Sequence, residues 1–180
     1  NPPVPWTWGR GYWTPYVAQE HRTVREAVGV MDMTLMSKFL VQGPHAAHVL
    51  DRLSANAVVG EVGKVTYTQW CNERGGIEAD LTVTRLARDR FLVVASDVIH
   101  RRVERMLNDE PREREFVTVT DVTAGFAILT VQGPHARELL SRVSPDDLSN
   151  EGFPYLTARE IEVGYSRVLT LRVTYLGELG

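Results

Sequence analysis

The feature that most constrains the fold of this chain is a duplicated block. Val41–Ala46 and Val131–Ala136 have the same six residues, Val-Gln-Gly-Pro-His-Ala, at a spacing of 90 residues. The similarity extends upstream, where Asp32-Met33-Thr34 matches Asp121-Val122-Thr123 with a slip of one residue. Because six identities in a row at one offset rarely arise by chance, the sequence predicts two related halves within its 180 residues.

Each copy of the block has the pattern of a strand, a tight turn and a helix. The β-prone apolar residues before each glycine favour a strand. Pro44 and Pro134 then occupy the first helical position, where the fixed φ angle of proline costs no hydrogen bond. The apolar residues on one face of the expected helices are Ala47, Leu50 and Leu53 in the first half and Leu139, Leu140 and Val143 in the second.

Most of the remaining chain also has the pattern of strands, with one further helix at 98–106. The expected strand ranges are 65–70, 79–86, 91–95, 161–163 and 168–175. Polarity alternates along 81–86, which is typical of a strand with two different faces. Because strands outnumber helices and do not alternate regularly with them, we predict an α+β fold class with mainly antiparallel sheets.

The N-terminal segment differs in composition from the rest. Residues 1–16 have four prolines together with Trp6, Trp8 and Trp13, so an extended arm is predicted, followed by an amphipathic helix at 17–28. The arm either lies over its own domain or packs on a neighbouring one. The predicted organisation is an arm and helix at 1–28, then a domain at 29–180 made of halves at about 29–115 and 116–180.

Composition and charge exclude some classes of function. Lys and Arg number 20 against 23 Asp and Glu, and the resulting net charge of −3 argues against nucleic-acid binding. No run approaches the 18 apolar residues that a membrane span needs, so no membrane partner is expected. Cys71 is the only cysteine and is expected to be a buried structural thiol in a reducing compartment. With no signal-peptide pattern, we expect the cytoplasm, or the mitochondrial matrix in a eukaryote.

The segment with the strongest chemical pattern is a hairpin around Gly75-Gly76. A diglycine permits the positive φ angles of a tight turn, which would place Asp80 on the returning strand opposite residues 67–70. Aspartate is depleted in strands, and an inward-facing carboxylate needs a partner or a ligand. Asp80 is therefore a candidate functional residue, the alternative being a solvent-facing carboxylate. His45 and His48 have no evident third ligand nearby, so no metal site is predicted.

These segments resemble, in order along nearly the whole chain, the folate-binding domain of the glycine-cleavage T-protein (aminomethyltransferase) superfamily. The resemblance is carried by Val28–Thr34, Lys38–Pro44, Tyr67, Asn72–Asp80, Asp121–Thr123, Val131–Pro134 and Arg172–Glu178. The Trp-rich arm before Glu20-His21-Arg22, and Phe153-Pro154-Tyr155, look closer to the C-terminal half of dimethylglycine and sarcosine dehydrogenases and oxidases.

The resemblance implies two related halves with tetrahydrofolate in the cleft between them. Asp80 matches the catalytic aspartate of the family, and the positions that line the pterin are Met36, Tyr67, Thr82 and Tyr175. In such enzymes, oxidation of an N-methylated amine produces a cationic iminium that N5 of tetrahydrofolate attacks. A fixed carboxylate stabilises that charge and accepts a proton.

The resemblance also implies parts that this chain does not contain. FAD is expected on an N-terminal flavin domain of the same polypeptide, since the chain has no G-x-G-x-x-G fingerprint. A second pterin-holding glutamate of the relatives falls beyond Gly180, so we expect a C-terminally truncated domain that is inactive alone and binds folate poorly.

Three alternatives remain open at this point. They are a stand-alone aminomethyltransferase of glycine cleavage, a non-catalytic folate-binding assembly factor, and an O-demethylase that uses folate as methyl acceptor. Retention of Asp80 argues against the non-catalytic reading. An N-terminal dinucleotide fingerprint in the full gene would favour the amine-demethylating enzyme over the stand-alone transferase.

Overall fold

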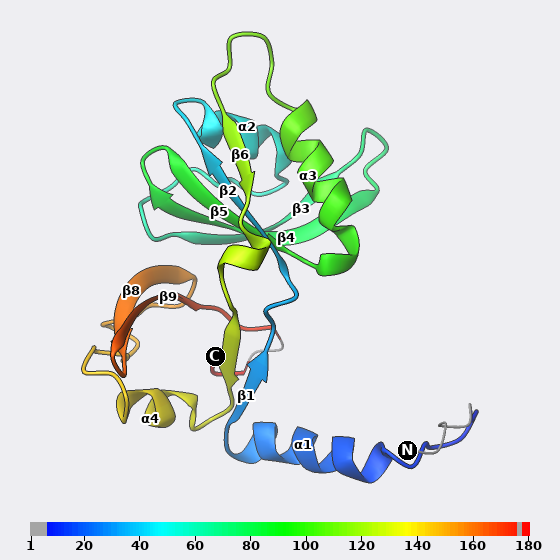
Figure 1. The fold of residues 1–180 in the computed structure, drawn as a ribbon, viewed down its shortest axis with the longest axis vertical. Coiled ribbons are helices and arrows are strands. Elements are labelled where there is room, and N and C mark those ends of the chain that lie inside the picture. Colours follow the sequence, from blue (N-terminus) through cyan, green and yellow to red (C-terminus); the bar gives the residue numbers. More distant parts are fainter. Residues whose placement is uncertain (1–6, 176–177) are drawn as a thin grey trace.

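The structure, a computed structural model, describes residues 7–175 and 178–180 (Figure 1). Its α+β class and its antiparallel strand pairing agree with the prediction. The α-helices are α1 (Thr14–Glu26), α2 (Ala46–Leu53), α3 (His100–Asp109) and α4 (Ala136–Ser141). The strands are β1 (Gly29–Asp32), β2 (Ser37–Gln42), β3 (Val65–Cys71), β4 (Ile77–Ala87), β5 (Arg90–Ala95), β6 (Thr118–Asp121), β7 (Leu129–Gln132), β8 (Thr157–Val163) and β9 (Ser166–Arg172).

The first half is a five-stranded antiparallel sheet with helices on one face. The strand order is β3-β4-β5-β2-β6, and α2 and α3 cover the same face (Figure 1). Alternation along each strand sends one set of apolar side chains to these helices, where Phe39, Trp70, Leu81 and Phe91 are buried. Leu50 of α2 and Leu107 of α3 complete this core. The opposite face of the sheet is left free of helices and carries most of the predicted site.

The second half repeats this plan in part. Strand β7 is followed by α4, as β2 is by α2, and the β8–β9 hairpin has the place of β3–β4. The described strands form two separate two-stranded sheets, β1-β7 and β8-β9, instead of one larger sheet. Its core is correspondingly small and consists of Leu148, Phe153 and Ile161, with Leu140 and Val163 packed against them.

The opening strands of the two halves are exchanged. β1 precedes the first half but pairs with β7 of the second, whereas β6 precedes the second half but pairs with β2 of the first. The same hydrogen bond, from a backbone N–H to a threonine hydroxyl, recurs at both crossings. Thr123 Oγ1 accepts from Lys38 N–H at 3.0 Å, and Thr34 Oγ1 accepts from Ile128 N–H at 3.1 Å. The division near residue 115 thus falls in the connection between α3 and β6, and each half supplies one strand to the other.

The N-terminal region extends away from the rest of the molecule (Figure 1). Helix α1 begins at Thr14, earlier than expected, because Pro15 is well suited to the first helical turn. No residue of α1 is buried, and Trp8 and Trp13 are exposed. Over residues 7–16 the arm therefore does not pack on its own domain, and residues 1–6 of the predicted arm lie outside the described residues.

Two further comparisons with the sequence concern the strands and the membrane. The expected strand at 168–175 is observed as β9 and ends at Arg172, and the short strands β1 and β6 were not expected. Among the described residues, no helix is long and apolar enough to cross a bilayer.

Candidate functional site

The free face of the five-stranded sheet brings together side chains that are far apart in the sequence. In the strand register, Tyr67 pairs with Thr82, Thr82 with Val94, and Val94 with Lys38. One row of side chains therefore crosses β3, β4, β5 and β2 on the face opposite α2 and α3. Two of the predicted cofactor-binding residues, Tyr67 and Thr82, are direct cross-strand neighbours in this row.

Asp80 and Tyr67 form the chemically distinctive pair of this face. Asp80 lies two residues before Thr82 on β4 and so points to the same side. The Tyr67 hydroxyl donates to Asp80 Oδ2 at 2.7 Å. This hydrogen bond is the main reason that the pKa of Tyr67 lies above its usual value. The phenol therefore stays protonated as a donor and holds one carboxylate oxygen in a fixed direction.

Met36 lies in the turn that leads into β2, and a buried lysine shapes this turn. Lys38 is 1% exposed, and its ammonium donates to the carbonyls of Thr34 at 2.9 Å and Met36 at 2.8 Å. Burial lowers the pKa of Lys38, an effect that the negative charge of Asp121 opposes. The two carbonyls are satisfied in the interior by a cation, which fixes the backbone that carries Met36.

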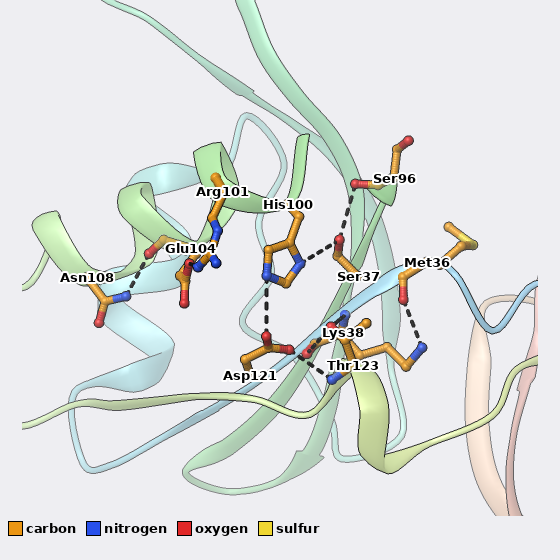
Figure 2. A network of polar contacts seen from close by, with 10 residues as sticks. All are labelled: Met36, Ser37, Lys38, Ser96, His100, Arg101, Glu104, Asn108, Asp121 and Thr123. Atoms are coloured by element: carbon orange, nitrogen blue, oxygen red, sulfur yellow. Dashed lines mark hydrogen bonds and ion pairs between the residues drawn. The ribbon is translucent and has the colours of Figure 1, made fainter. Parts of the chain in front are cut away.

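A polar network on the helix-covered face of the sheet fixes the start of β2 (Figure 2). His100 of α3 lies between two partners, with Nδ1 at 2.9 Å from Ser37 Oγ and Nε2 at 3.3 Å from Asp121 Oδ2. Hydrogen bonds from Thr123 are the largest cause of the lowered pKa of Asp121, and His100 adds to the effect. The network joins α3, β2 and β6, and thus ties the turn with Met36 to the exchanged strand.

Tyr175 comes from the second half and reaches the same region. It is 89% exposed, and it lies close enough to Tyr67 to contribute to the raised pKa of that phenol. Its backbone N–H donates to Glu178 Oε1 at 2.8 Å. The structure therefore brings Tyr175 towards Tyr67 from across the two halves.

Asp80 is exposed at the open sheet face and is not enclosed in a pocket. Two surface hollows of the described residues lie elsewhere. One is between Glu61–Lys64 and Gly152–Arg159, and the other is beside Asp146 and Arg167. Neither hollow adjoins Asp80, so the expected pocket beside it is not among them, and its carboxylate faces solvent, the alternative that the sequence left open.

The remaining candidate residues, Cys71, His45 and His48, have a structural role or no assigned role. Cys71 is exposed, so the expectation of a buried thiol was wrong, because the last residue of β3 lies at the open edge of the hairpin. His45 Nδ1 accepts from Phe116 N–H at 2.9 Å, and His48 is 67% exposed. No group of three potential metal-ligating side chains occurs within 7–175 and 178–180.

Sequence reasoning missed three residues that bear on this site. Lys38 was given no role, because lysine is seldom buried, yet its side chain is 1% exposed and no local pattern shows this. The Gln69 side chain acts on the Tyr67 phenol and lowers its pKa, opposing Asp80. Glu178 accepts from Thr174 Oγ1 at 2.9 Å and orders the segment that carries Tyr175.

Comparison with known proteins gives the class to which this fold and site belong. Residues 3–180 match the GCVT N-terminal domain, so the chain belongs to this folate-binding family. The solved aminomethyltransferase T of the glycine cleavage system from Bartonella henselae superimposes with a TM-score of 0.73 at 28% identity. The match covers 98% of this chain and 45% of that one. The predicted family and fold are confirmed.

The curated relatives are enzymes of two kinds. The chain is 39% identical, over its whole length, to 22% of the 4-methylaminobutanoate oxidase (formaldehyde-forming) of Paenarthrobacter nicotinovorans. It is 37% identical to an aminomethyltransferase of Saccharopolyspora erythraea, over 91% of this chain and 44% of that protein. Mouse mitochondrial dimethylglycine dehydrogenase is 30% identical over 95% of this chain and 20% of its own length. The chain spans less than half the length of these relatives.

Proposed function

We propose that this chain is the tetrahydrofolate-dependent one-carbon transfer domain of an enzyme that demethylates N-methylated amines. The observation that carries the proposal is the Asp80 carboxylate, held by the Tyr67 hydroxyl at 2.7 Å on an open sheet face. Relatives named as 4-methylaminobutanoate oxidase, dimethylglycine dehydrogenase and sarcosine dehydrogenase support this choice, because all three names denote N-methylated amines. The flavin that oxidises the amine would belong to a part of the protein outside this chain.

The residues of the free face fit a reduced pterin. A pterin is flat and presents several N–H groups along one edge, so it suits a carboxylate acceptor flanked by aromatic rings. Asp80 would supply the acceptor, and Tyr67, whose hydroxyl bonds that carboxylate, and Tyr175 would supply aromatic rings. Thr82, beside Tyr67 in the strand register, and Met36, in the turn held by Lys38, would line the remaining edge.

In this proposal the site stabilises a positive charge and accepts a proton. Tetrahydrofolate supplies the nucleophilic nitrogen that takes up the one-carbon unit. The Asp80 carboxylate stabilises the positive charge that accompanies transfer and accepts a proton at Oδ1 or Oδ2. Tyr67 keeps the carboxylate oriented, because its hydroxyl occupies one lone pair of Oδ2.

The test uses the intact enzyme with amine and tetrahydrofolate, measuring methylenetetrahydrofolate and free formaldehyde separately. Asp80→Asn should lower the yield of methylenetetrahydrofolate about a hundredfold or more. Amine oxidation should continue, so the lost carbon appears as formaldehyde. Tyr67→Phe should lower transfer by roughly tenfold or more, the worth of one hydrogen bond to a charged group.

Glu78→Gln is the matched control, because it removes one carboxylate from the same strand at a side chain that bonds Asn72 and Arg102. It should leave transfer unchanged. Transfer by Asp80→Asn at the rate of the unaltered enzyme would refute the proposal.

A second candidate is a stand-alone aminomethyltransferase. The 37% identity with the Saccharopolyspora erythraea enzyme, of which this chain covers 44%, favours it. The full gene separates the two candidates, since a G-x-G-x-x-G segment ahead of this domain supports the flavin enzyme.

A further inference from the structure

Three side chains on the helix-covered face form a row of contacts that the proposed function does not use. They are Ser37 of β2, His100 of α3 and Asp121 of β6 (Figure 2). Ser37 Oγ donates to the carbonyl of Ser96 at 3.3 Å and lies 2.9 Å from His100 Nδ1. On the other side of the ring, His100 Nε2 lies 3.3 Å from Asp121 Oδ2. The row therefore joins a helix to two neighbouring strands of the first sheet.

The residue types are those of a hydrolytic triad, but their arrangement does not suit nucleophilic attack. Ser37 is 0% exposed, so no substrate reaches its hydroxyl. The side chains of His100 and Asp121 are 23% and 40% exposed, so the ring can exchange protons with solvent. The row is therefore suited to binding a proton and not to covalent catalysis.

The number of protons in the row decides which contacts form. The Ser96 carbonyl and the ionised Asp121 carboxylate can only accept hydrogen bonds. When the Ser37 hydroxyl donates to Ser96, both ring nitrogens of His100 must donate, so the ring must carry two protons. A neutral ring has one N–H. If that N–H faces Asp121, the Ser37 hydroxyl must turn from Ser96 to Nδ1. All three contacts thus form together only with the doubly protonated ring.

The neutral arrangement is also possible for the backbone. The Ser96 carbonyl has a second donor, the Ile99 N–H at 3.3 Å, so it keeps a partner when the Ser37 hydroxyl turns away. Because no buried carbonyl is left unpaired, the row can exist in either state. What the neutral state loses is the charge of the contact between His100 and Asp121, since charge-assisted hydrogen bonds are the stronger kind.

The negative charge beside the ring persists over the whole neutral range. Hydrogen bonds from Thr123 are the largest cause of a pKa of Asp121 below its ordinary value, so this carboxylate stays ionised well into the acid range. The other acid near the start of α3 is Asp97, whose Oδ1 accepts from Ser96 Oγ at 3.3 Å. Asp121 is thus the carboxylate with which a protonated ring pairs.

Two cations act on Asp121 from a distance and do not replace the ring. Arg101 is paired with Glu104 at 2.7 Å, and the Lys38 ammonium donates to two backbone carbonyls. Within the described ranges 7–175 and 178–180, His100 is the only basic side chain within 4.0 Å of the Asp121 carboxylate. The close charge pair at this position therefore depends on the protonation of His100.

We propose that His100 is a pH-sensitive switch, which holds β6 against α3 and β2 when its ring is doubly protonated and loosens β6 when the ring is neutral. This inference does not depend on the proposed function. Strand β6 is the element that should respond, because it has four residues and lies at the edge of the sheet beside β2. It also leads from the first half into the second, so the switch acts at the crossing between them.

The experiment is hydrogen exchange of the intact protein at about pH 5.5 and about pH 8, on either side of the ordinary histidine value of about 6.5. Each rate is divided by the intrinsic rate at that pH, which gives a protection factor. Protection of residues 118–122 should fall about fivefold from the lower to the higher pH, the difference between a charge-assisted and a neutral hydrogen bond. Strand β3, at the far edge of the same sheet, is the internal control and should change little.

Two variants remove the switch in different ways. His100→Gln keeps a donor and an acceptor but does not titrate, so the pH dependence of β6 should disappear. Asp121→Asn removes the charge but keeps Oδ1, which accepts from Thr123 N–H at 2.9 Å, and should have the same effect. His48→Gln is the matched control, because His48 also faces a carboxylate, Glu115 at 3.8 Å, but on the exposed surface. It should keep the dependence.

The outcomes separate a switch from a merely structural contact. A structural contact would lower the protection of β6 in both variants and leave its pH dependence unchanged. Protection of β6 that is equal at the two pH values, that rises with pH, or that keeps its pH dependence in either variant would overturn the proposal. Since each variant tests the charge pair by itself, one that folds is sufficient.

Discussion

Arg52 connects three segments of the first half. It projects from α2, donates to Glu110 Oε1 at 2.7 Å, and bonds both carboxylate oxygens of Glu115 at 2.7 and 2.8 Å. The Arg52 guanidinium is the largest cause of the fall in the pKa of Glu115 to about 2, and the Arg112 backbone N–H adds to it. A bidentate pair of this kind fixes the connection between α3 and β6 against α2.

The Glu115 carboxylate makes stability depend on pH in a defined window. Its folded pKa of about 2 lies below the ordinary value of 4.5, so its stabilisation is complete above about pH 4.5 and is lost as the pH falls towards 2. Glu115→Gln should flatten the dependence of the unfolding free energy on pH in that window, measured by urea unfolding between pH 2 and 6. Glu113→Gln, at an exposed neighbour, is the control and should keep the original slope.

At the scale of elements, the Gly-Pro turn is the unit that the sequence uses twice. Gly43 and Gly133 have φ angles of +132° and +124°, a region that disfavours residues with a Cβ. Space is also lacking, because a Cβ would lie 2.3 Å from the carbonyl of Phe116 at Gly43 and 2.5 Å from that of Ala27 at Gly133. Each turn is thus packed against the chain that leads into an exchanged strand.

Alanine at either turn glycine should therefore be costly. Gly43→Ala and Gly133→Ala should each lower the free energy of unfolding by about 2 kcal/mol or more, from backbone strain and the clash together. Gly75→Ala is the matched control, since Gly75 has a φ of +78° but no atom within 4 Å of the added Cβ. It should cost about 1 kcal/mol, the strain alone. Equal losses at all three sites in denaturant unfolding would contradict this account.

At the scale of the whole molecule, the exchange of β1 and β6 joins the halves into one folding unit. Unfolding of either half would remove a paired strand from the other, because the five-stranded sheet contains β6 and the β1-β7 sheet contains β1, each from the other side of the division. Two domains joined by a linker could unfold separately, but an exchanged pair is expected to unfold in a single transition.

This expectation has a direct test with one probe in each half. The fluorescence of Trp70, buried in the first core, and the amide exchange of Ile161, in the second core, should give the same urea midpoint in a variant with Trp6, Trp8 and Trp13 replaced by Phe. Thr34→Val leaves the Ile128 N–H without its acceptor. The free energy of unfolding reported by each probe should fall by the same amount, about 1–3 kcal/mol. Midpoints that separate would show independent halves.

The predictions from sequence succeeded where the cause is local. The strands around the duplicated block, the Gly-Pro turns and the alternation along β4 follow from neighbouring residues, whose polarity and φ preferences act over a few positions. The boundaries of α1 and β9 shifted by a few residues, and the strands β1 and β6 were missed. Four residues are too few for a recognisable pattern, and their pairing partners lie about 80 to 100 residues away.

By itself, the sequence determined that this protein is a duplicated α+β chain, with one aspartate placed after a diglycine bend. Only the tertiary structure decided that the opening strands cross over, that Lys38 is buried under the turn with Met36, and that Tyr175 approaches Tyr67. The physical reason is that strand register and the burial of a charge depend on contacts between distant segments. Such contacts are determined by residues far apart in the sequence and not by the order of neighbouring ones.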